Sequence, residues 1–489
     1  MERIKSTFLP SEYVKTNVRF AVDRRLVFGK NLILTRDKET IDADSLIFLG
    51  KILEHTPQTD FFGFNVWLDA SYPYVILIPG RRGTGKSYTM GVLVEGLVLD
   101  NQETPATTKN TKHAVVLFDT LGQFWQMKHP ASDRDAEGKK QLKDLKSWGL
   151  NSKGVTQIQV FVPVGRKIVA EWKELVLKFS EVEMAEIAGL LDVDLYQDRM
   201  GQLLNHVYTK VKEEGYQSAC QNELTGAFQK KEFVAPKKDF SVQHLIDCID
   251  KDSEIISPTA GFEIQTRRAL RSRLQSMSRW KVFSDKGTPV SDIFRKDTLT
   301  IVNLEGIDED LRNLIVAVVT RKIFQAREIS RKREKLVDAG EEVSTSHGAS
   351  IPPGWLVVDE AHEFCPSVGR TAAKEPLIRF AKEGRSLGLG LILATQQPSA
   401  LSEKLSSQVE TIISHALAFN SDIQSLKGRL VNGIVNEFFH KNEVFSFDEQ
   451  VRLLSPGAAV VSTIGIPTIF LMQVRPRLSL HGGKAPRMG

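Results

Sequence analysis

The clearest chemical signal in the sequence is a glycine-rich stretch, residues 80–87, which reads Gly-Arg-Arg-Gly-Thr-Gly-Lys-Ser. It matches the phosphate-binding pattern Gly-x-x-x-x-Gly-Lys-Ser/Thr at every fixed position. A continuous apolar run, 75–78, precedes it, and a helical pattern follows over 88–99. In such a loop backbone N–H groups point at phosphate oxygens, and the helix N-terminus adds its positive dipole end. The alternative is a chance glycine-rich turn, which the flanking strand and helix disfavour.

Lys86 of this loop is expected to bridge the β- and γ-phosphates of a nucleotide, and the Ser87 hydroxyl is expected to bind Mg²⁺. The sequence contains no Asn-Lys-x-Asp signature for guanine, so we expect the nucleotide to be ATP. The residues expected to contact it are Gly80, Arg81, Arg82, Gly83, Thr84, Gly85, Lys86, Ser87 and Tyr88.

A phosphate-binding loop needs an acidic partner, and residues 355–360, Trp-Leu-Val-Val-Asp-Glu, supply one. An apolar strand that ends here would place Asp359 in the Mg²⁺ shell and Glu360 where it can polarise the attacking water. The alternative is a strand that ends in a solvated acidic turn. Since an Asp-Glu pair separates hydrolysing motor ATPases from kinases and switch GTPases, we predict ATP hydrolysis with Glu360 as the catalytic base.

Two further polar residues flank another apolar run, 389–394. Gln396 follows the run and is predicted to sense the γ-phosphate or the attacking water, although an ordinary polar strand end is the alternative. Arg385 precedes the run. It is predicted to act on the nucleotide of a neighbouring subunit as an arginine finger, against the alternative of a solvated cation.

Residues 359–362 also spell Asp-Glu-Ala-His, the box of a different helicase class. Those enzymes carry two similar α/β domains in tandem, and the box falls within the first. Too few residues follow Gln396 to build a second domain of roughly 150 residues. The four letters are therefore interpreted as a coincidence.

The pattern of strands and helices that must position these residues predicts an α/β fold. Apolar runs at 75–78, 113–119, 158–163, 298–304, 355–358 and 389–394 are typical of strands buried on both faces of a parallel sheet. Shorter β-like runs lie at 26–28 and 31–34, a long helix is expected from about 310 to 335, and 338–350 reads as a mobile loop. We predict a RecA-like P-loop core over 71–166 and 282–489, a helical insertion over 167–281, and a small β-rich N-terminal module over 1–70.

Composition agrees with a folded protein. Hydrophobic residues make up 41% of the 489 residues and charged residues 26%, the net charge is +5, and the three cysteines form no CxxC pair. This excludes disordered, fibrous and disulfide-framework classes. The first residues show no signal peptide, and the uncharged run 457–474 is interpreted as two strands around a Gly-Ile-Pro turn rather than a membrane span. A cytoplasmic protein without membrane contact is expected.

The motifs together resemble the HerA branch of the FtsK/HerA motor ATPases. The likeness rests on the phosphate-binding loop, the late Asp-Glu strand end, residues 382–391 (Lys-Glu-Gly-Arg-Ser-Leu-Gly-Leu-Gly-Leu) and residues 394–399 (Ala-Thr-Gln-Gln-Pro-Ser). It extends from about residue 73 to 477. The resemblance implies a homohexameric ring that hydrolyses ATP between subunits and moves double-stranded DNA through a central pore, commonly with a nuclease partner. The chain departs from the family in three places. Residues 119–123 (Asp-Thr-Leu-Gly-Gln) replace the family's Asp-Pro-His-Gly-Glu-like run, and no basic residue stands just before the strand that leads into the glycine-rich loop. The N-terminal module is also short for the family's β-barrel.

Two basic segments could contact DNA. The first is Arg267, Arg268, Arg271, Arg273, Arg279 and Lys281, which either binds phosphates in a pore or forms a solvated or intersubunit helix face. The second, within 321–335, contains Glu328 and Glu334 and is interpreted as a solvated face. Because no base-reading module is recognisable, DNA binding is expected to be independent of sequence.

The sequence thus favours a HerA-type ATP-hydrolysing DNA translocase or helicase. One alternative is a ring-shaped ATPase scaffold that assembles and activates a nuclease or a sirtuin-type, NAD-consuming effector in anti-phage defence. Another is a P-loop ATPase that remodels protein or pumps DNA at a membrane, as in conjugation.

Overall fold

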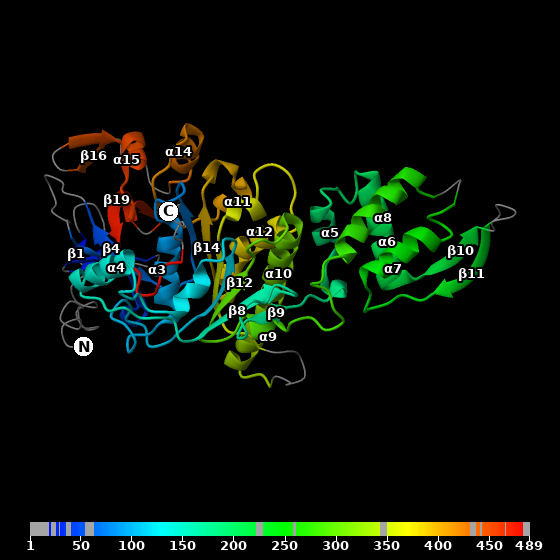
Figure 1. Ribbon diagram of the computed structural model, residues 1–489, viewed down its shortest axis with the longest axis horizontal. Helices are drawn as coiled ribbons and strands as arrows, with labels where there is room; N and C mark the ends of the chain where they lie inside the picture. Colours follow the sequence, from blue (N-terminus) through cyan, green and yellow to red (C-terminus); the bar gives the residue numbers. More distant parts are fainter. Residues whose placement is uncertain are drawn as a thin grey trace.

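The structure is a computed structural model, and it describes residues 19–20, 26–28, 30–35, 41–53, 63–221, 228–257, 261–342, 350–430, 437–440, 443–464 and 466–482 (Figure 1). Fifteen strands form one sheet in the order β1-β2-β3-β5-β4-β19-β18-β15-β6-β14-β13-β7-β12-β8-β9. Its strands are β1 (Arg19–Phe20), β2 (Leu26–Phe28), β3 (Asn31–Leu34), β4 (Leu46–Ile52), β5 (Asn65–Asp69), β6 (Val75–Pro79), β7 (Ala114–Asp119), β8 (Ile158–Pro163), β9 (Lys173–Leu175), β12 (Leu299–Asn303), β13 (Gly354–Val358), β14 (Leu389–Thr395), β15 (Thr411–Ser414), β18 (Ala458–Thr463) and β19 (Ile466–Val474).

Helices surround this sheet, and two hairpins stand outside it. The helices are α3 (Lys86–Val98), α4 (Ala136–Ser147), α5 (Met184–Leu190), α6 (Arg199–Thr209), α7 (Val242–Lys251), α8 (Ile264–Ser278), α9 (Val290–Ile293), α10 (Glu309–Asp338), α11 (Ala361–Phe364), α12 (Lys374–Glu383), α13 (Glu403–Ser406), α14 (Asn420–Lys427) and α15 (Phe447–Leu453). The hairpins pair β10 (Tyr216–Gln221) with β11 (Phe228–Val234) and β16 (Glu437–His440) with β17 (Glu443–Ser446).

The centre of the sheet is parallel, in the order β6-β14-β13-β7-β12-β8. These are the six strands expected from continuous apolar runs, and each expectation is confirmed to within a residue or two at either end. They are mostly apolar, as expected for strands that helices cover on both faces. Since parallel strands all end at the same edge, residues that follow β6, β7, β13 and β14 gather there. The α/β fold class is therefore confirmed.

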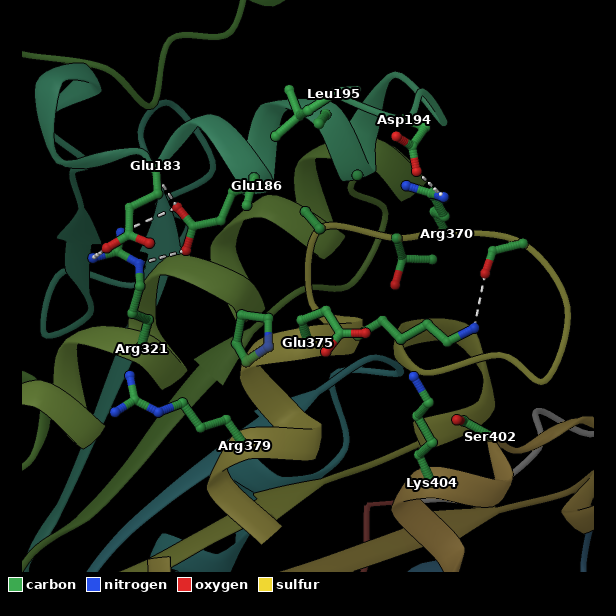
Figure 2. A pocket seen from close by; sticks show the side chains of 18 of the residues that line it. Glu183, Glu186, Asp194, Leu195, Arg321, Arg370, Glu375, Arg379, Ser402 and Lys404 are labelled. Atoms are coloured by element: carbon green, nitrogen blue, oxygen red, sulfur yellow. Dashed lines mark hydrogen bonds and ion pairs between the residues drawn. The ribbon is translucent and has the colours of Figure 1, made fainter. Parts of the chain in front are cut away.

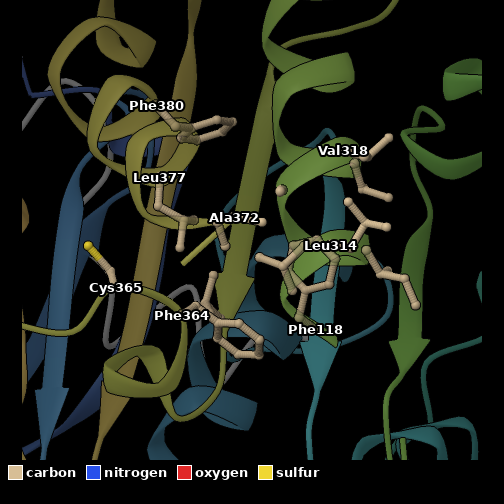
Figure 3. Close-up of a cluster of buried hydrophobic side chains, with 14 of the residues drawn as sticks. Phe118, Leu314, Val318, Phe364, Cys365, Ala372, Leu377 and Phe380 are labelled. Carbon is tan, nitrogen blue, oxygen red and sulfur yellow. The ribbon is translucent and has the colours of Figure 1, made fainter. Parts of the chain in front are cut away.

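The two faces of the sheet support separate cores. Val75 and Leu77 of β6 pack with α10 and α12, whereas the alternate residues Ile76 and Ile78 pack with α3. Figure 3 shows part of the first core, in which Phe118 of β7 meets Leu314 and Val318 of α10 and, nearby, Phe364, Leu377 and Phe380. Helix α3, which carries the end of the glycine-rich loop, is thus fixed against the sheet by burial along nearly its whole length.

The N-terminal strands continue the sheet. β4 pairs with β19 and with β5, and β5 pairs with β3. The short strands expected at 26–28 and 31–34 are confirmed as β2 and β3. Residues 1–18, 21–25, 29, 36–40 and 54–62 of the expected module lie outside the described residues, and its separation from the core stays a prediction.

The segment expected to be a helical insertion contains α5–α8 and, in addition, the β10–β11 hairpin (Figure 1, green, at the end away from the N-terminal strands). The hairpin was missed because its strands show no alternation of apolar and polar residues. The chain leaves the sheet and returns at adjacent points: Leu177 N–H donates to Val282 O over 2.8 Å, and Ser284 N–H donates to Leu177 O over 3.0 Å. The bounds of the insertion stay a prediction.

A cavity of about 760 Å³ lies where α5 and the following loop face α12 and residues 367–372 (Figure 2). Buried Glu186 accepts from Arg321 of α10 over 2.7 Å, and Asp194 accepts from Arg370 over 2.6 Å. These ion pairs fasten the insertion to the core.

The basic segment of α10 differs from its expectation as a solvated face. Arg321 pairs with Glu186, Lys322 pairs with Glu181 over 2.6 Å, and buried Arg327 pairs with Glu334 over 2.5 Å. The first half of this basic segment therefore holds the fold together: Arg321 and Lys322 contact the insertion, and Arg327 also donates to Leu387 O before β14. Lys332 and Lys335, farther along, are exposed as expected.

The uncharged run at the C-terminal end forms β18 and β19, so the two-strand interpretation is confirmed, although Ile466 and Pro467 belong to β19 and Gly465 lies outside the described residues. Within the described residues no helix is long and apolar enough to cross a membrane. Helix α10 ends at Asp338, the first residue of the expected mobile loop, and residues 343–349 of that loop lie outside the described residues.

Candidate functional site

The glycine-rich loop connects β6 to α3, as the pattern predicts. Gly83 and Gly85 have φ values of +78° and +122°, which side-chain-bearing residues adopt only with strain. Helix α3 begins at Lys86, so its unpaired first-turn N–H groups and its dipole lie at the loop. The backbone is therefore arranged for an anion before any ligand is present.

Segments far along the chain are hydrogen-bonded to the backbone of the loop. Arg81 N–H donates to Ala416 O over 2.8 Å, and Gly457 N–H donates to Thr84 O over 3.0 Å. Gly80 and Gly85 must lack side chains here, since a Cβ on Gly80 would lie 2.8 Å from His415 Cβ, and one on Gly85 would lie 3.2 Å from Gly457 N. The loop's shape thus depends on the residues directly after β15 and directly before β18.

Fully buried His415 is a site residue that sequence reasoning missed. Its Nε2 lies 2.8 Å from Thr89 Oγ1 of α3, and its Nδ1 donates to Ala458 O over 2.9 Å. Burial lowers the pKa of His415 to about 4, so the ring is neutral at physiological pH and adds no charge beside Lys86. A lone histidine after a strand carries no sequence signal for this role.

Two buried carboxylates stand side by side at the ends of β7 and β13. Asp119 and Asp359 are both fully buried, and the Phe118–Val358 pairing makes their strands neighbours. Burial raises the pKa of Asp119 to about 6, and burial, together with Glu360 and Asp119, raises the pKa of Asp359. Asp119 Oδ1 has no hydrogen-bond partner within the described chain. A cluster of buried acids with an unpartnered oxygen fits a cation, so these residues are compatible with Mg²⁺.

Glu360 has a left-handed backbone, with φ 49° and ψ 49°, which is strained for a residue with a side chain. Its carboxylate lies 3.9 Å from Lys86 Nζ and accepts from Gln396 twice, over 2.5 Å from Nε2 and over 3.3 Å from the backbone N–H. Burial lowers the pKa of Lys86, while Glu360 and Asp359 oppose that shift. Three predicted site residues are thus brought into direct contact.

The strand order explains the position of Gln396. β14 lies between β6 and β13 in the sheet, so the residue after it lies between the loop that follows β6 and the acids that follow β13. Gln123, in the turn after Asp119, completes the group, because its Nε2 donates to Ser87 Oγ over 3.3 Å.

Arg385 is not brought to this site. It is exposed, in the short 3₁₀ turn Gly384–Leu387 before β14, whereas Gln396 follows β14. A strand of seven residues is about 23 Å long, so Arg385 and Gln396 lie at opposite edges of the sheet.

A cavity of about 1050 Å³, large enough for a nucleotide, lies over the glycine-rich loop. Its walls include Lys86, Ser87, Gln123, Glu360 and Gln396. On another side they include Tyr88, Trp148 and, from the C-terminal segment, Gln473, Val474, Pro476, His481 and Gly482.

Comparison with known proteins is consistent with this geometry. Residues 75–323, just over half of the chain, match the family model described as "Helicase HerA, central domain". The chain belongs to the HerA family. The match begins at β6 and therefore includes the glycine-rich loop and the Asp119 strand end.

Individual HerA proteins match shorter parts of the chain. The DNA double-strand break repair helicase HerA of Sulfurisphaera tokodaii is 27% identical over 180 residues, 37% of this chain and 28% of that protein. The HerA of Pyrococcus furiosus is 32% identical over 128 residues, 24% of this chain and 23% of that protein. The aligned parts thus span less than a third of these relatives.

Among solved structures, VirB4 of Thermoanaerobacter pseudethanolicus is similar with a TM-score of 0.46 and 14% identity, over 88% of this chain and 96% of that one. The bacterial conjugative coupling protein TrwB has a TM-score of 0.46 and 12% identity, over 87% and 90%.

Proposed function

We propose that this HerA-type protein hydrolyses ATP and uses the energy to move double-stranded DNA, as a ring of identical subunits. The observation that carries the proposal is the convergence of Lys86, Glu360 and Gln396 beside the two buried acids at one sheet edge. The names of the relatives, DNA repair helicases, support DNA as the substrate.

The chemistry is divided among residues of this chain. The glycine-rich loop and Lys86 bind the phosphates, and Ser87 and Asp359 would hold Mg²⁺, which supplies positive charge opposite the phosphate oxygens. Glu360 takes a proton from the attacking water, and Gln396, already bonded to Glu360, orients that water or the γ-phosphate.

Arg385 acts in this proposal on the nucleotide of the next subunit. Its distance from its own site, at the other edge of the sheet, supports a role in trans. A positive charge supplied there would stabilise the transition state of phosphoryl transfer.

The candidate DNA contacts are Arg268 of α8 and Arg279 and Lys281 directly after it, because the other cations of this segment are already engaged. Arg271 pairs with Asp250 over 2.9 Å, Arg273 donates to Leu191 O, and Arg267 donates to Phe262 O, so these three serve the insertion itself. The other members of the segment, Arg268, Arg279 and Lys281, are exposed. They are the ones left to bind phosphates.

Linear double-stranded DNA should raise the steady-state ATPase rate, with Lys86→Ala as the blank. Because backbone charge drives the binding, DNA affinity should fall with salt. Replacing Arg268, Arg279 and Lys281 by alanine should lower the log–log salt slope by about 1 for each phosphate that the protein no longer neutralises. The matched control replaces exposed Lys332 and Lys335 of α10 and should leave the slope unchanged.

A substantial ATPase rate that is indifferent to DNA would contradict the translocase proposal. It would favour the second candidate, a ring that clusters a nuclease or an NAD-consuming effector, and the partner protein would become the object of study.

Arg385→Ala should lose most ATPase activity alone and regain part of it when mixed with Glu360→Gln subunits. Hybrid interfaces then contain one intact Glu360 and one intact Arg385, which neither variant has by itself. Activity is measured across mixing ratios at constant total protein. No recovery at any ratio would contradict a role in trans.

A further inference from the structure

The nucleotide cavity has a second wall, beside the phosphate-binding loop, with a different chemistry. The residues that line it include the ring-bearing Tyr88, Trp148, Pro476 and His481 and the amide-bearing Gln473. Ring faces and a single amide are the groups with which proteins hold planar heterocycles rather than phosphates.

This wall is held rigidly by the C-terminal segment 475–482, which is fastened to α3. Glu95, Arg475 and Arg477 have no exposed surface. Glu95 accepts from Arg475 Nη1 over 2.8 Å and from the N–H groups of residues 478 and 479 over 3.0 and 2.9 Å, and Arg477 Nε lies 3.5 Å from it. Both arginines lie against Glu95 and donate further to backbone oxygens, Arg475 to Phe48 O and Arg477 to Leu480 O. Since neither has exposed surface, they serve to fix the segment rather than to bind a phosphate.

Two of the rings are oriented by the same network. Tyr88 Oη accepts from Arg477 N–H over 2.7 Å, and His481 Nδ1 lies 3.1 Å from Arg477 Nη1. Because a guanidinium only donates, His481 Nδ1 must accept, which fixes the ring's tautomer and its orientation. The His481 ring meets Tyr88 edge to face, with centroids 5.4 Å apart at 75°.

Gln473 is brought close to the phosphate-binding loop through two glycines. A Cβ on Gly85 would lie 3.2 Å from Gly457 N, and a Cβ on Gly457 would lie 2.8 Å from Gln473 Nε2. The absence of both side chains lets the amide lie beside Gly457, which itself contacts the loop at Gly85. A ligand held by Lys86 would therefore extend from the loop, past Gln473, toward the rings.

We propose that this wall is the subsite for the nucleoside part of ATP, with the base against His481, Tyr88 and Trp148 and with Gln473 as a polar contact. The proposal rests on the proposed function, since it assigns the non-phosphate end of the same ligand. His481 and Gln473 then determine how tightly a nucleoside triphosphate binds relative to its phosphate chain alone.

Isothermal titration calorimetry compares the affinity for ATP with the affinity for inorganic tripolyphosphate, each with Mg²⁺. The difference measures what the nucleoside part contributes to binding. His481→Ala should weaken ATP binding about tenfold, as removal of a ring that stacks on a base does, and should leave tripolyphosphate binding within about twofold. Unchanged tripolyphosphate binding also shows that the variant is folded. Gln473→Ala should act in the same direction.

Matched variants sharpen the test. His481→Phe keeps a ring and should retain ATP affinity. His129→Ala removes another histidine that stands edge-on to an aromatic ring, Trp125, but does not line this cavity, and it should change neither affinity.

Unchanged ATP affinity in His481→Ala, or equal losses for ATP and tripolyphosphate, would overturn the subsite. Equal losses in His481→Phe and His481→Ala would overturn the ring contact. Failure of the proposed function looks different, because Lys86→Ala would then bind both ligands as tightly as the wild type.

Discussion

Glu360→Gln should turn over ATP at least about a hundredfold more slowly than the wild type while still binding ATP, given the usual size of general-base effects. The substitution keeps the side chain's shape and one oxygen that can accept from Gln396, but it removes the group that takes the proton from water. Steady-state ATPase assays and calorimetric ATP titration measure the two halves of this prediction.

Glu363→Gln is the matched control for this variant. Glu363 lies on the short helix α11, directly after Glu360, and pairs with Arg312 over 2.9 Å, outside the nucleotide cavity. Its turnover should stay within about twofold of the wild type, as for most substitutions that touch no reacting group. Wild-type turnover by Glu360→Gln would show that another residue is the base.

Glu95→Gln should destabilise the protein by about 3–5 kcal/mol, because breaking a buried ion pair leaves uncompensated charge in the interior. Here one substitution leaves two fully buried guanidinium groups, Arg475 and Arg477, without their carboxylate. The measurement is the urea midpoint of unfolding, followed by intrinsic tryptophan fluorescence.

Two comparisons isolate the buried charge as the cause. Glu383→Gln removes the exposed partner of Arg379 and should cost less than about 1 kcal/mol. A triple variant with Glu95→Leu, Arg475→Met and Arg477→Met removes all three charges and should be more stable than Glu95→Gln alone. Equal midpoints for Glu95→Gln and Glu383→Gln would contradict the prediction.

The central sheet could be predicted because its strands are buried on both faces. Continuous apolar runs mark such strands irrespective of what lies next to them. The order of the strands could not be read in this way, since it depends on which helices cross which face. The β10–β11 hairpin was missed for a related reason, because strands outside the main sheet need no continuous apolar run.

For the candidate site, too, the sequence predicted some features and not others. Lys86, Asp359, Glu360 and Gln396 follow strands in recognisable local patterns, so their types and spacing predicted a site, and the structure brings them together. Their contacts needed the fold, because β14 must enter between β6 and β13 before Gln396 can reach Glu360.

The residues that sequence reasoning missed act through distant partners. His415 contacts Thr89 across more than three hundred residues, and Glu95 accepts from the C-terminal segment across a longer separation. A buried histidine or glutamate has no local pattern that distinguishes it from an ordinary core or surface residue. The basic segment of α10 was misinterpreted for the same reason, since the acidic partners of Arg321 and Lys322 lie on the insertion.

The insertion leaves and re-enters the sheet through hydrogen-bonded neighbours, Leu177 on one side and residues 282 and 284 on the other. A segment whose ends already touch can be lengthened, shortened or exchanged in evolution without altering the strands that carry the nucleotide site. The same ATPase core can therefore acquire a different accessory surface when this insertion is replaced by another. Divergence among related proteins should concentrate in this segment, while the distance between its two ends is preserved.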